Sequence, residues 1–247
     1  MIPMMERNAK EILRDPLTLL FGLGLPLALL GMMTAINSAS PVQVWQFQPE
    51  IFLPAMAVFS LAFMTLFSGQ LLAHDRASAF LSRVFASPMP ARSYILSYAA
   101  PCIAVGLTQS LACLLAGLLL GVPPRWSLLL APLALLPTAV LFVALGLTLG
   151  ALLSEKQVGG LCGGIVVNLA GLAGGIWFDL RMFGEPWQRL LYALPFAHSV
   201  DTARAALRGD WSAMLPHLGW TTLWAVACLA LALLLFDRRK RLGLLSV

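Results

Sequence analysis

Residues 51–73 read IFLPAMAVFSLAFMTLFSGQLLA and contain no charged side chain. A helix needs about 20 consecutive, mostly apolar residues to span the hydrocarbon core of a bilayer, so this stretch predicts a transmembrane helix. Five further windows lack Asp, Glu, Lys and Arg and are long enough for such a helix; they are residues 16–49, 93–124, 126–154, 157–178 and 211–236. We therefore expect an all-α integral membrane protein with six transmembrane helices.

The composition of the whole chain agrees with this interpretation. Of its 247 residues, 60% are hydrophobic and 11% are charged, and the mean hydropathy is +0.86. Soluble domains carry about 25% charged residues, so an ordinary water-soluble globule is excluded. The spans leave no room for a soluble domain, and we expect one transmembrane domain over residues 1–247. The expected spans are residues 17–36, 51–73, 93–121, 128–154, 158–178 and 218–236.

The basic residues predict the orientation of the spans, because cytoplasmic loops hold an excess of Lys and Arg. With the N-terminus inside, the predicted inner segments contain 11 of the 16 basic residues, including the run at 238–241. Both termini are therefore expected in the cytoplasm, and the protein is expected to be a multi-pass protein of the bacterial cytoplasmic (inner) membrane. The net charge of +5 is then a topology signal, and no nucleic-acid partner is expected.

Two amphipathic segments are expected on the inner membrane surface. In residues 4–15, four apolar side chains share one helical stripe; they are Met5, Ala9, Ile12 and Leu13. In residues 74–92, between spans two and three, apolar residues again share one face until Pro88 and Pro90 end the pattern. On the outer side, residues 179–217 form a long, half-polar segment, within which the apolar stretch 190–200 is too short to cross the membrane.

The chain lacks the polar clusters that catalysis or metal binding needs. The four cysteines lie in apolar windows without Cys-x-x-Cys spacing, and the three histidines are scattered between the two sides. No lysine follows a glycine, so a glycine-lysine phosphate loop is excluded and we expect this chain to bind no cofactor of its own. No acid or base lies inside a predicted span, whereas ion-coupled transporters usually hold one at mid-membrane.

Span five is crowded with glycines spaced by four, a pattern that allows helices to approach closely in membranes. The residues singled out here are Gly160, Gly164, Gly171 and Gly175, with the polar Asn168 among them. Two interpretations stay open. The glycine side of span five faces either a path through the membrane or a second copy of the chain, or the glycines serve helix packing within one chain.

The order of these features resembles a known family. An amphipathic helix enters span one through Arg14, Asp15 and Pro16, six spans follow, and the segment LPFAHSVDTARAALRGD (194–210) precedes the last of them. This arrangement is similar to the ABC-2 type permease subunits of ATP-binding-cassette exporters. The resemblance implies a six-span permease domain with an N-terminal surface helix, an inner coupling helix between spans two and three, and short outer helices before span six.

The resemblance also implies the sites. The coupling helix would contact the ATPase subunit through Asp75, Arg76, Phe80, Leu81, Arg83, Val84, Phe85, Ser87 and Pro88. This sequence departs from the family pattern at Ala79, Phe80 and Ser82, where Gly, Thr and Glu are common. The outer helices match through Pro195, Asp201 and Arg204, for which an ordinary salt-bridged helix face is the alternative interpretation.

The expected function is therefore that of an exporter permease. It would move an amphiphilic, drug-like, peptide or lipid-linked substrate outward, together with two ABC ATPase subunits that bind the ATP and magnesium, and with a second permease subunit that is either the same chain or a paralogue. Membrane lipids are its further partners. Two alternatives stay open: a non-transporting membrane partner such as an immunity or assembly factor, and an integral-membrane lipid-modifying enzyme.

Overall fold

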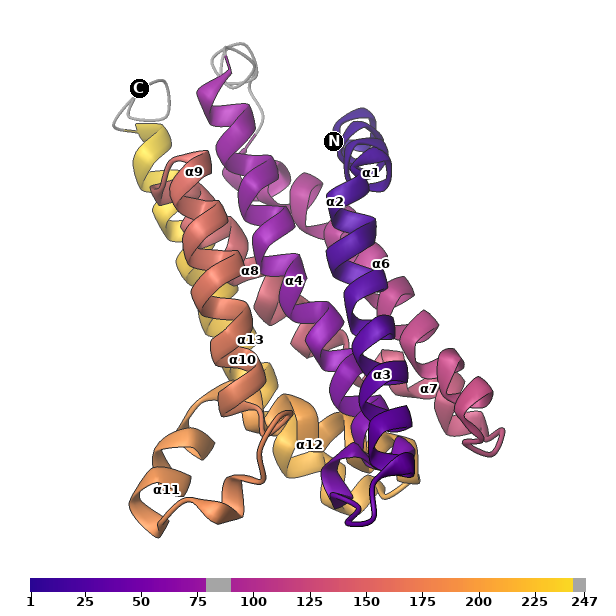
Figure 1. Ribbon diagram of the computed structural model, residues 1–247. Coiled ribbons are helices and arrows are strands. Elements are labelled where there is room, and N and C mark those ends of the chain that lie inside the picture. Colours follow the sequence, from indigo (N-terminus) through magenta and orange to yellow (C-terminus); the bar gives the residue numbers. More distant parts are fainter. Residues whose placement is uncertain (79–89, 242–247) are drawn as a thin grey trace.

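The computed structural model describes residues 1–78 and 90–241, and every regular element in this part of the chain is helical (Figure 1). Six helical stretches are long and apolar enough to cross a membrane. They are Pro16–Ala39, Pro49–Ala77, Arg92–Leu120, Trp126–Leu152, Glu155–Ala173 and Trp211–Arg238. The expectation of an all-α integral membrane protein with six spanning helices is confirmed.

Most of the spans combine more than one helical element. The first contains α2 (Pro16–Leu19), the π-helical turn η1 (Leu20–Gly24) and α3 (Leu25–Ala39), the second is α4 (Pro49–Ala77), and the third joins α6 (Ala91–Ala116) to the 3-10 turn η3 (Gly117–Leu120). The fourth joins α7 (Trp126–Ala134) to α8 (Leu136–Leu152), the fifth joins α9 (Glu155–Val158), η4 (Gly159–Val166) and α10 (Val167–Ala173), and the sixth is α13 (Trp211–Arg241). Outside the spans lie α1 (Ile2–Arg14), η2 (Trp45–Phe47), η5 (Leu180–Met182), α11 (Glu185–Ala193) and α12 (Pro195–Arg208).

Helix α4 is the centre of the bundle. Its most apolar window is 89% buried inside the protein, whereas the corresponding windows of the first and sixth spans are 22% buried. It packs against α8 and α6, and Figure 1 shows it running between α3 and the α9–α10 stretch. The outer spans therefore leave most of their apolar side chains exposed at the surface that a bilayer would cover.

Small residues bring the backbones of α4 and α8 together. A Cβ atom at Gly150 of α8 would lie 2.4 Å from the carbonyl oxygen of Gly69 on α4, and a Cβ atom at Gly146 would lie 2.3 Å from the carbonyl oxygen of Thr65. Small residues four apart permit such contacts in membranes. Close helix packing was expected at the glycines of span five, and the contact at Gly146 and Gly150 of span four was not predicted.

The two ends of the bundle carry different elements (Figure 1). At one end, called here the α1 end, lie α1, the C-terminal ends of α4 and α13, and α9. At the other, called the α12 end, lie α11, α12 and the N-terminal ends of α4 and α7. Helix α1 lies across the bundle rather than along it, as expected of a surface helix.

The fifth span is shorter than predicted. Its helix ends at Ala173 rather than at Phe178, because Gly175 closes it in a Schellman turn. The amide of Ile176 donates to the carbonyl oxygen of Gly171 at 3.1 Å, and Gly175 has a φ of +65°, which favours glycine over other residues. The predicted extension to Phe178 was wrong because the apolar window continues past this turn.

Other boundaries also differ from the prediction. Helix α13 begins at Trp211 rather than at Leu218, because the carboxylate of Asp210 accepts a hydrogen bond from the amide of Ala213 at 3.0 Å and caps the helix. Helix α4 continues to Ala77, beyond the predicted end of span two, because its last turn is held by neighbouring helices. Span one contains Gly22, Gly24 and Pro26, and its helix continues through them with the π-helical turn η1.

Candidate functional site

A buried ion pair joins α1 to the last turn of α4 at the α1 end. The Asp75 side chain is 1% exposed, and Arg7 donates to both of its oxygens, from Nη1 to Oδ2 at 2.6 Å and from Nη2 to Oδ1 at 2.7 Å. This is the two-pronged geometry that makes arginine-carboxylate pairs strong. A buried carboxylate without a partner would be costly, so Arg7 is required where Asp75 is buried.

Two tyrosines of α6 extend this pair into the bundle. The Tyr98 hydroxyl donates to Oδ2 of Asp75, and the hydroxyls of Tyr94 and Tyr98 lie 2.9 Å apart. The Tyr94 ring stacks on Phe236 of α13, with ring centroids 4.6 Å apart. Arg7, Asp75, Tyr98 and Tyr94 are called here the anchor cluster. It links α1, α4 and α6 by polar contacts and reaches α13 by ring stacking.

Helix α1 is fixed on α6 by a further contact. The side-chain amide of Asn8 is fully buried and donates to the carbonyl oxygen of Ser97 at 3.0 Å. The buried side of α1 consists of Met4, Asn8 and Ile12, whereas Leu13 is 54% exposed. The side of α1 that packs against the bundle is therefore rotated by about one residue from the predicted apolar stripe, because polar contacts fix α1 on α4 and α6. The membrane contact expected of the stripe stays a prediction.

The last turn of α4 is also tied to span four. Arg76 donates from Nη1 to the carbonyl oxygens of Gly150 at 2.7 Å and Leu153 at 3.1 Å. These carbonyls belong to the C-terminal end of α8, where helix carbonyls lack partners within the helix and carry partial negative charge. Nδ1 of His74 lies 3.3 Å from Oε2 of Glu155, at the start of α9.

These contacts change the role that the resemblance implied for the start of the coupling helix. Asp75 and Arg76 belong to α4 and point into their own subunit, so they do not form an exposed docking surface. The other predicted ATPase contacts lie outside the described residues; they are Phe80, Leu81, Arg83, Val84, Phe85, Ser87 and Pro88. The anchor cluster holds the two helix ends that border residues 79–89.

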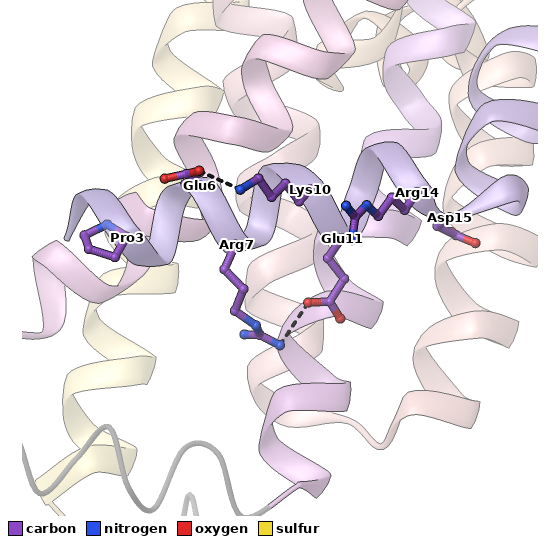
Figure 2. A pocket seen from close by; sticks show the side chains of 7 residues that line it. All are labelled: Pro3, Glu6, Arg7, Lys10, Glu11, Arg14 and Asp15. Carbon is purple, nitrogen blue, oxygen red and sulfur yellow. Dashed lines mark hydrogen bonds and ion pairs between the residues drawn. The ribbon is translucent and has the colours of Figure 1, made fainter.

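The exposed side of α1 forms a shallow, charged pocket of about 650 Å³. Figure 2 shows its lining residues along the helix; they are Pro3, Glu6, Arg7, Lys10, Glu11, Arg14 and Asp15. Lys10 pairs with Glu6 at 2.6 Å, and Arg7 pairs with Glu11 at 2.9 Å. Arg7 thus connects this charged surface with the buried Asp75.

The glycines predicted on one side of span five occupy two different environments. Gly160, Gly164 and Asn168 are exposed, and nothing lies within 4 Å of a Cβ atom placed at either of these two glycines. Gly171 is buried, and a Cβ atom there would lie 2.5 Å from Nε1 of Trp177. With Gly175 in the helix-ending turn, the predicted common face is wrong: Gly171 and Gly175 pack inside the subunit.

At the α12 end, the predicted outer residues come together. Pro195 lies in the first turn of α12, and Asp201 accepts a hydrogen bond from the Tyr192 hydroxyl at 2.9 Å. Arg204 lies 3.5 Å from Asp201 and donates from Nη2 to the carbonyl oxygen of Gly175 at 3.1 Å. The salt-bridged helix face is therefore present, and it also ties α12 to the end of α10.

Comparison with known proteins supplies the family. The family model described as ABC-2 type transporter matches residues 3–207, which includes α1, the anchor cluster and α12. None of the curated proteins compared with the chain matches it. Among the described residues, no group of His, Cys, Asp and Glu could hold a metal ion. The matched region covers far more than half of the chain, and the protein is a multi-pass membrane protein that belongs to the ABC-2 type transporter family, whose members serve as permeases of ABC transporters.

Proposed function

We propose that this chain is the permease subunit of an ATP-binding-cassette exporter in the bacterial inner membrane. The anchor cluster carries the proposal. Residues 79–89 leave the end of α4 and return at the start of α6, and one buried ion pair with its tyrosine partner fixes both helix ends to α1. A movement of residues 79–89 would therefore be transmitted to α1, α4 and α6 together. Coupling to a separate ATPase requires such a connected set of helices.

The motor would be a pair of ABC ATPase subunits on the cytoplasmic side, which bind the ATP and magnesium. In this arrangement the α1 end faces the cytoplasm, consistent with the basic residues near both termini. The coupling contact would run through residues 80–88, with Leu81 and Arg83 central to it. The whole chain would act as one permease domain, and none of its side chains would have a catalytic role.

The second permease half would contact span five and span one. The exposed stripe of Gly160, Gly164 and Asn168 supports this position, because glycines facing lipid would weaken the helix without providing a contact. The side-chain amide of Asn168 donates to the carbonyl oxygen of Gly164 at 2.7 Å. This hydrogen bond within the helix lowers the cost of placing Asn168 in an apolar contact. The partner is either the same chain or a paralogue.

The substrate would be an amphiphile, a drug-like molecule, a peptide or a lipid-linked compound. Ion coupling is disfavoured because the carboxylate of Asp75, which is buried in α4, is already neutralised by Arg7. A free acid at mid-membrane would mark an ion pathway. ATP hydrolysis on the partner subunits would then be the energy source for outward movement.

The test uses inside-out vesicles that contain the chain and its cognate ATPase. We expect fluorescent amphiphiles from a mixed panel to accumulate inside only when ATP is hydrolysed. Replacing ATP by a non-hydrolysable analogue should abolish accumulation, and collapsing the ion gradients should leave it intact. Transport by the purified chain alone, driven by an ion gradient, would overturn the proposal.

A further inference from the structure

A polar cavity of about 460 Å³ lies at the α12 end, on the opposite side of the molecule from the anchor cluster. Five segments line it: η2 with the start of α4, the turn after α10, η5, the end of α11, and α12. The charged and amide side chains of the lining are Gln46, Glu50, Asp179, Arg181, Asp201, Arg204 and Arg208.

The carboxylates of this cavity already have donors. Asp179 accepts from the backbone amide of Arg181 at 2.9 Å and from its guanidinium at 2.9 to 3.1 Å. Asp201 accepts from Tyr192 at 2.9 Å and faces Arg204 at 3.5 Å. Arg181 also lies over the ring of Trp45, 5.0 Å from its centroid. Glu50 is 60% exposed and pairs with Arg125 at 3.5 Å. Each carboxylate of the lining therefore has a cationic partner within the chain.

Several donors remain without acceptors. Gln46 is 5% exposed, and within the described chain its side-chain nitrogen has no hydrogen-bond partner. The same holds for Nε of Arg204, whose side chain is 15% exposed. Arg208 follows Arg204 by four residues on the same helix face, is exposed at the rim of the cavity, and pairs with no carboxylate among residues 1–78 and 90–241. Buried donors without acceptors are costly, so the cavity favours an occupant that supplies oxygen acceptors.

The charge of the two arginines narrows the class of occupant. Burial lowers the pKa of Arg204, and the nearby Arg208 cation acts in the same direction. An anion between the two guanidinium groups would offset both effects. Arginine recognises oxyanions through paired N–H groups, and phosphate fits this geometry.

The surroundings of the cavity place it at the level of lipid headgroups. Exposed tryptophans gather at the α12 end; they are Trp45, Trp126, Trp187 and Trp211. Tryptophan is enriched where the bilayer meets water. A second, apolar cavity of about 470 Å³ is lined by Leu172, Phe178 and Leu191 among others. Each of these three residues is within two positions in sequence of a residue that lines the polar cavity, so the same chain segments line both.

From this geometry we propose that the cavity between η2, the turn after α10 and α12 binds the phosphate group of a membrane lipid, with Arg204, Arg208 and Gln46 as donors. The apolar cavity on the same chain segment would accept part of the hydrocarbon. The lipid would be bound at this cavity rather than transported, so its binding is independent of the proposed transport function.

The test measures binding by isothermal titration calorimetry to the purified full chain in dodecyl maltoside. The probes are dioctanoyl phosphatidylglycerol, dioctanoylglycerol without phosphate, and inorganic phosphate. We expect saturable binding of the phosphatidylglycerol, weaker competition by inorganic phosphate, and no comparable binding of dioctanoylglycerol. Arg208→Gln should weaken the phosphatidylglycerol affinity about tenfold or more, because a charge-assisted hydrogen bond is lost.

Two further variants keep the test decisive. Gln46→Leu removes the buried donor without changing the charge and should also weaken binding. Arg189→Gln removes an exposed arginine of α11 that pairs with Glu185 outside the cavity, and it should bind like the wild type. Equal affinity in wild type, Arg208→Gln and Gln46→Leu would overturn the proposal, as would equal binding of dioctanoylglycerol or an absence of saturable binding. Equal affinity for inorganic phosphate would assign the site to a soluble oxyanion and overturn the lipid assignment.

Discussion

Arg7 of α1 and Asp75 of α4 are separated by 68 positions in the sequence, yet their side chains meet in a two-pronged ion pair with N–O distances of 2.6 and 2.7 Å. Asp75 is 1% exposed, whereas Arg7 is 35% exposed and also reaches Glu11. The pair therefore joins the charged outer side of α1 to the interior of the bundle, next to the segment where we propose that the ATPase docks.

Asp75→Asn should destabilise the protein by about 1–3 kcal/mol, measured by thermal unfolding in detergent. Breaking a fully buried ion pair costs about 3–5 kcal/mol, and the expected loss is smaller because Arg7 is partly exposed and can recover some solvation. Glu11→Gln is the matched control. It removes an exposed partner of the same arginine and should cost less than about 0.5 kcal/mol. Similar losses in both variants would show that the buried pair has no special role.

Gly150→Ala should destabilise the protein by about 1–3 kcal/mol, because the added methyl group would meet the backbone carbonyl of Gly69 and force α4 and α8 apart. Gly219→Ala in α13 should be neutral or stabilise by up to about 1 kcal/mol, since a Cβ atom there meets nothing and alanine favours helix. Thermal unfolding of both variants in the same detergent makes the comparison. Equal stability of the two would contradict the α4–α8 contact.

Span five provides a prediction about the dimer. A cysteine at the exposed Gly164 should form a cross-link between two permease halves when a short thiol cross-linker is added, if both halves are this chain. A cysteine at the buried Gly171 should not, because that position faces Trp177 of its own subunit. The native cysteines are all buried, so background labelling should be low. Free labelling of the Gly164 cysteine from the lipid phase, without any cross-link, would remove span five from the interface.

Histidine chemistry at the α12 end predicts a loss of stability at acidic pH. The Nδ1 atoms of His198 and His217 lie 2.8 Å apart, and Nε2 of His198 lies 2.9 Å from the carbonyl oxygen of Tyr192. Because a carbonyl oxygen can only accept, Nε2 of His198 carries a proton and donates it. A single proton then lies between the two Nδ1 atoms. A second proton would set two N–H groups against each other. Burial lowers the pKa of His198, and the nearby His217 acts in the same direction, whereas Asp201 opposes them.

The direction of the pH effect follows from linkage. The unfolded chain takes up a proton at the ordinary histidine pKa of about 6.5, and the folded chain takes it up only at lower pH. The stability that neutral His198 contributes is therefore fully present above a pH of about 6.5, and it is lost as the pH falls from there toward the lower pKa of the folded state. Melting temperatures measured from pH 8 to pH 5 should decline, and the decline should be shallower in His198→Gln. His74→Gln, which changes an exposed histidine, should decline like the wild type; a parallel decline in all three proteins would contradict the assignment.

The spanning helices could be predicted because charge-free windows longer than a bilayer crossing leave few alternatives. Their ends could not be predicted as well, because single hydrogen bonds decide them. With Asp210 as its cap, α13 begins seven positions before the predicted start, and Gly175 turns the chain while the apolar composition continues. Hydropathy reports transfer into lipid and contains no information about these caps.

The anchor cluster could not be predicted from the sequence. Apolar spacing in residues 4–15 favoured a stripe containing Met5 and Leu13, but the structure buries Asn8, because Ser97 accepts its amide and Asp75 accepts Arg7. Tyr94 and Tyr98 carried a weak signal, since residues four apart share one helix face. Their partner Asp75, however, lies on another helix, and a pairing of that kind depends on tertiary packing.

The central claim is that a separate ATPase drives this permease through the segment between α4 and α6. The direct measurement is the rate of ATP hydrolysis by the cognate ATPase, alone and reconstituted with the chain in nanodiscs, together with transport by the same complex. We expect the ATPase to bind the wild-type chain and to change its rate on binding. With Leu81→Asp, inserted normally, hydrolysis should no longer be coupled to transport. Normal coupled transport by a well-expressed Leu81→Asp variant, or an ATPase that neither binds nor responds to the correctly inserted chain, would contradict the claim.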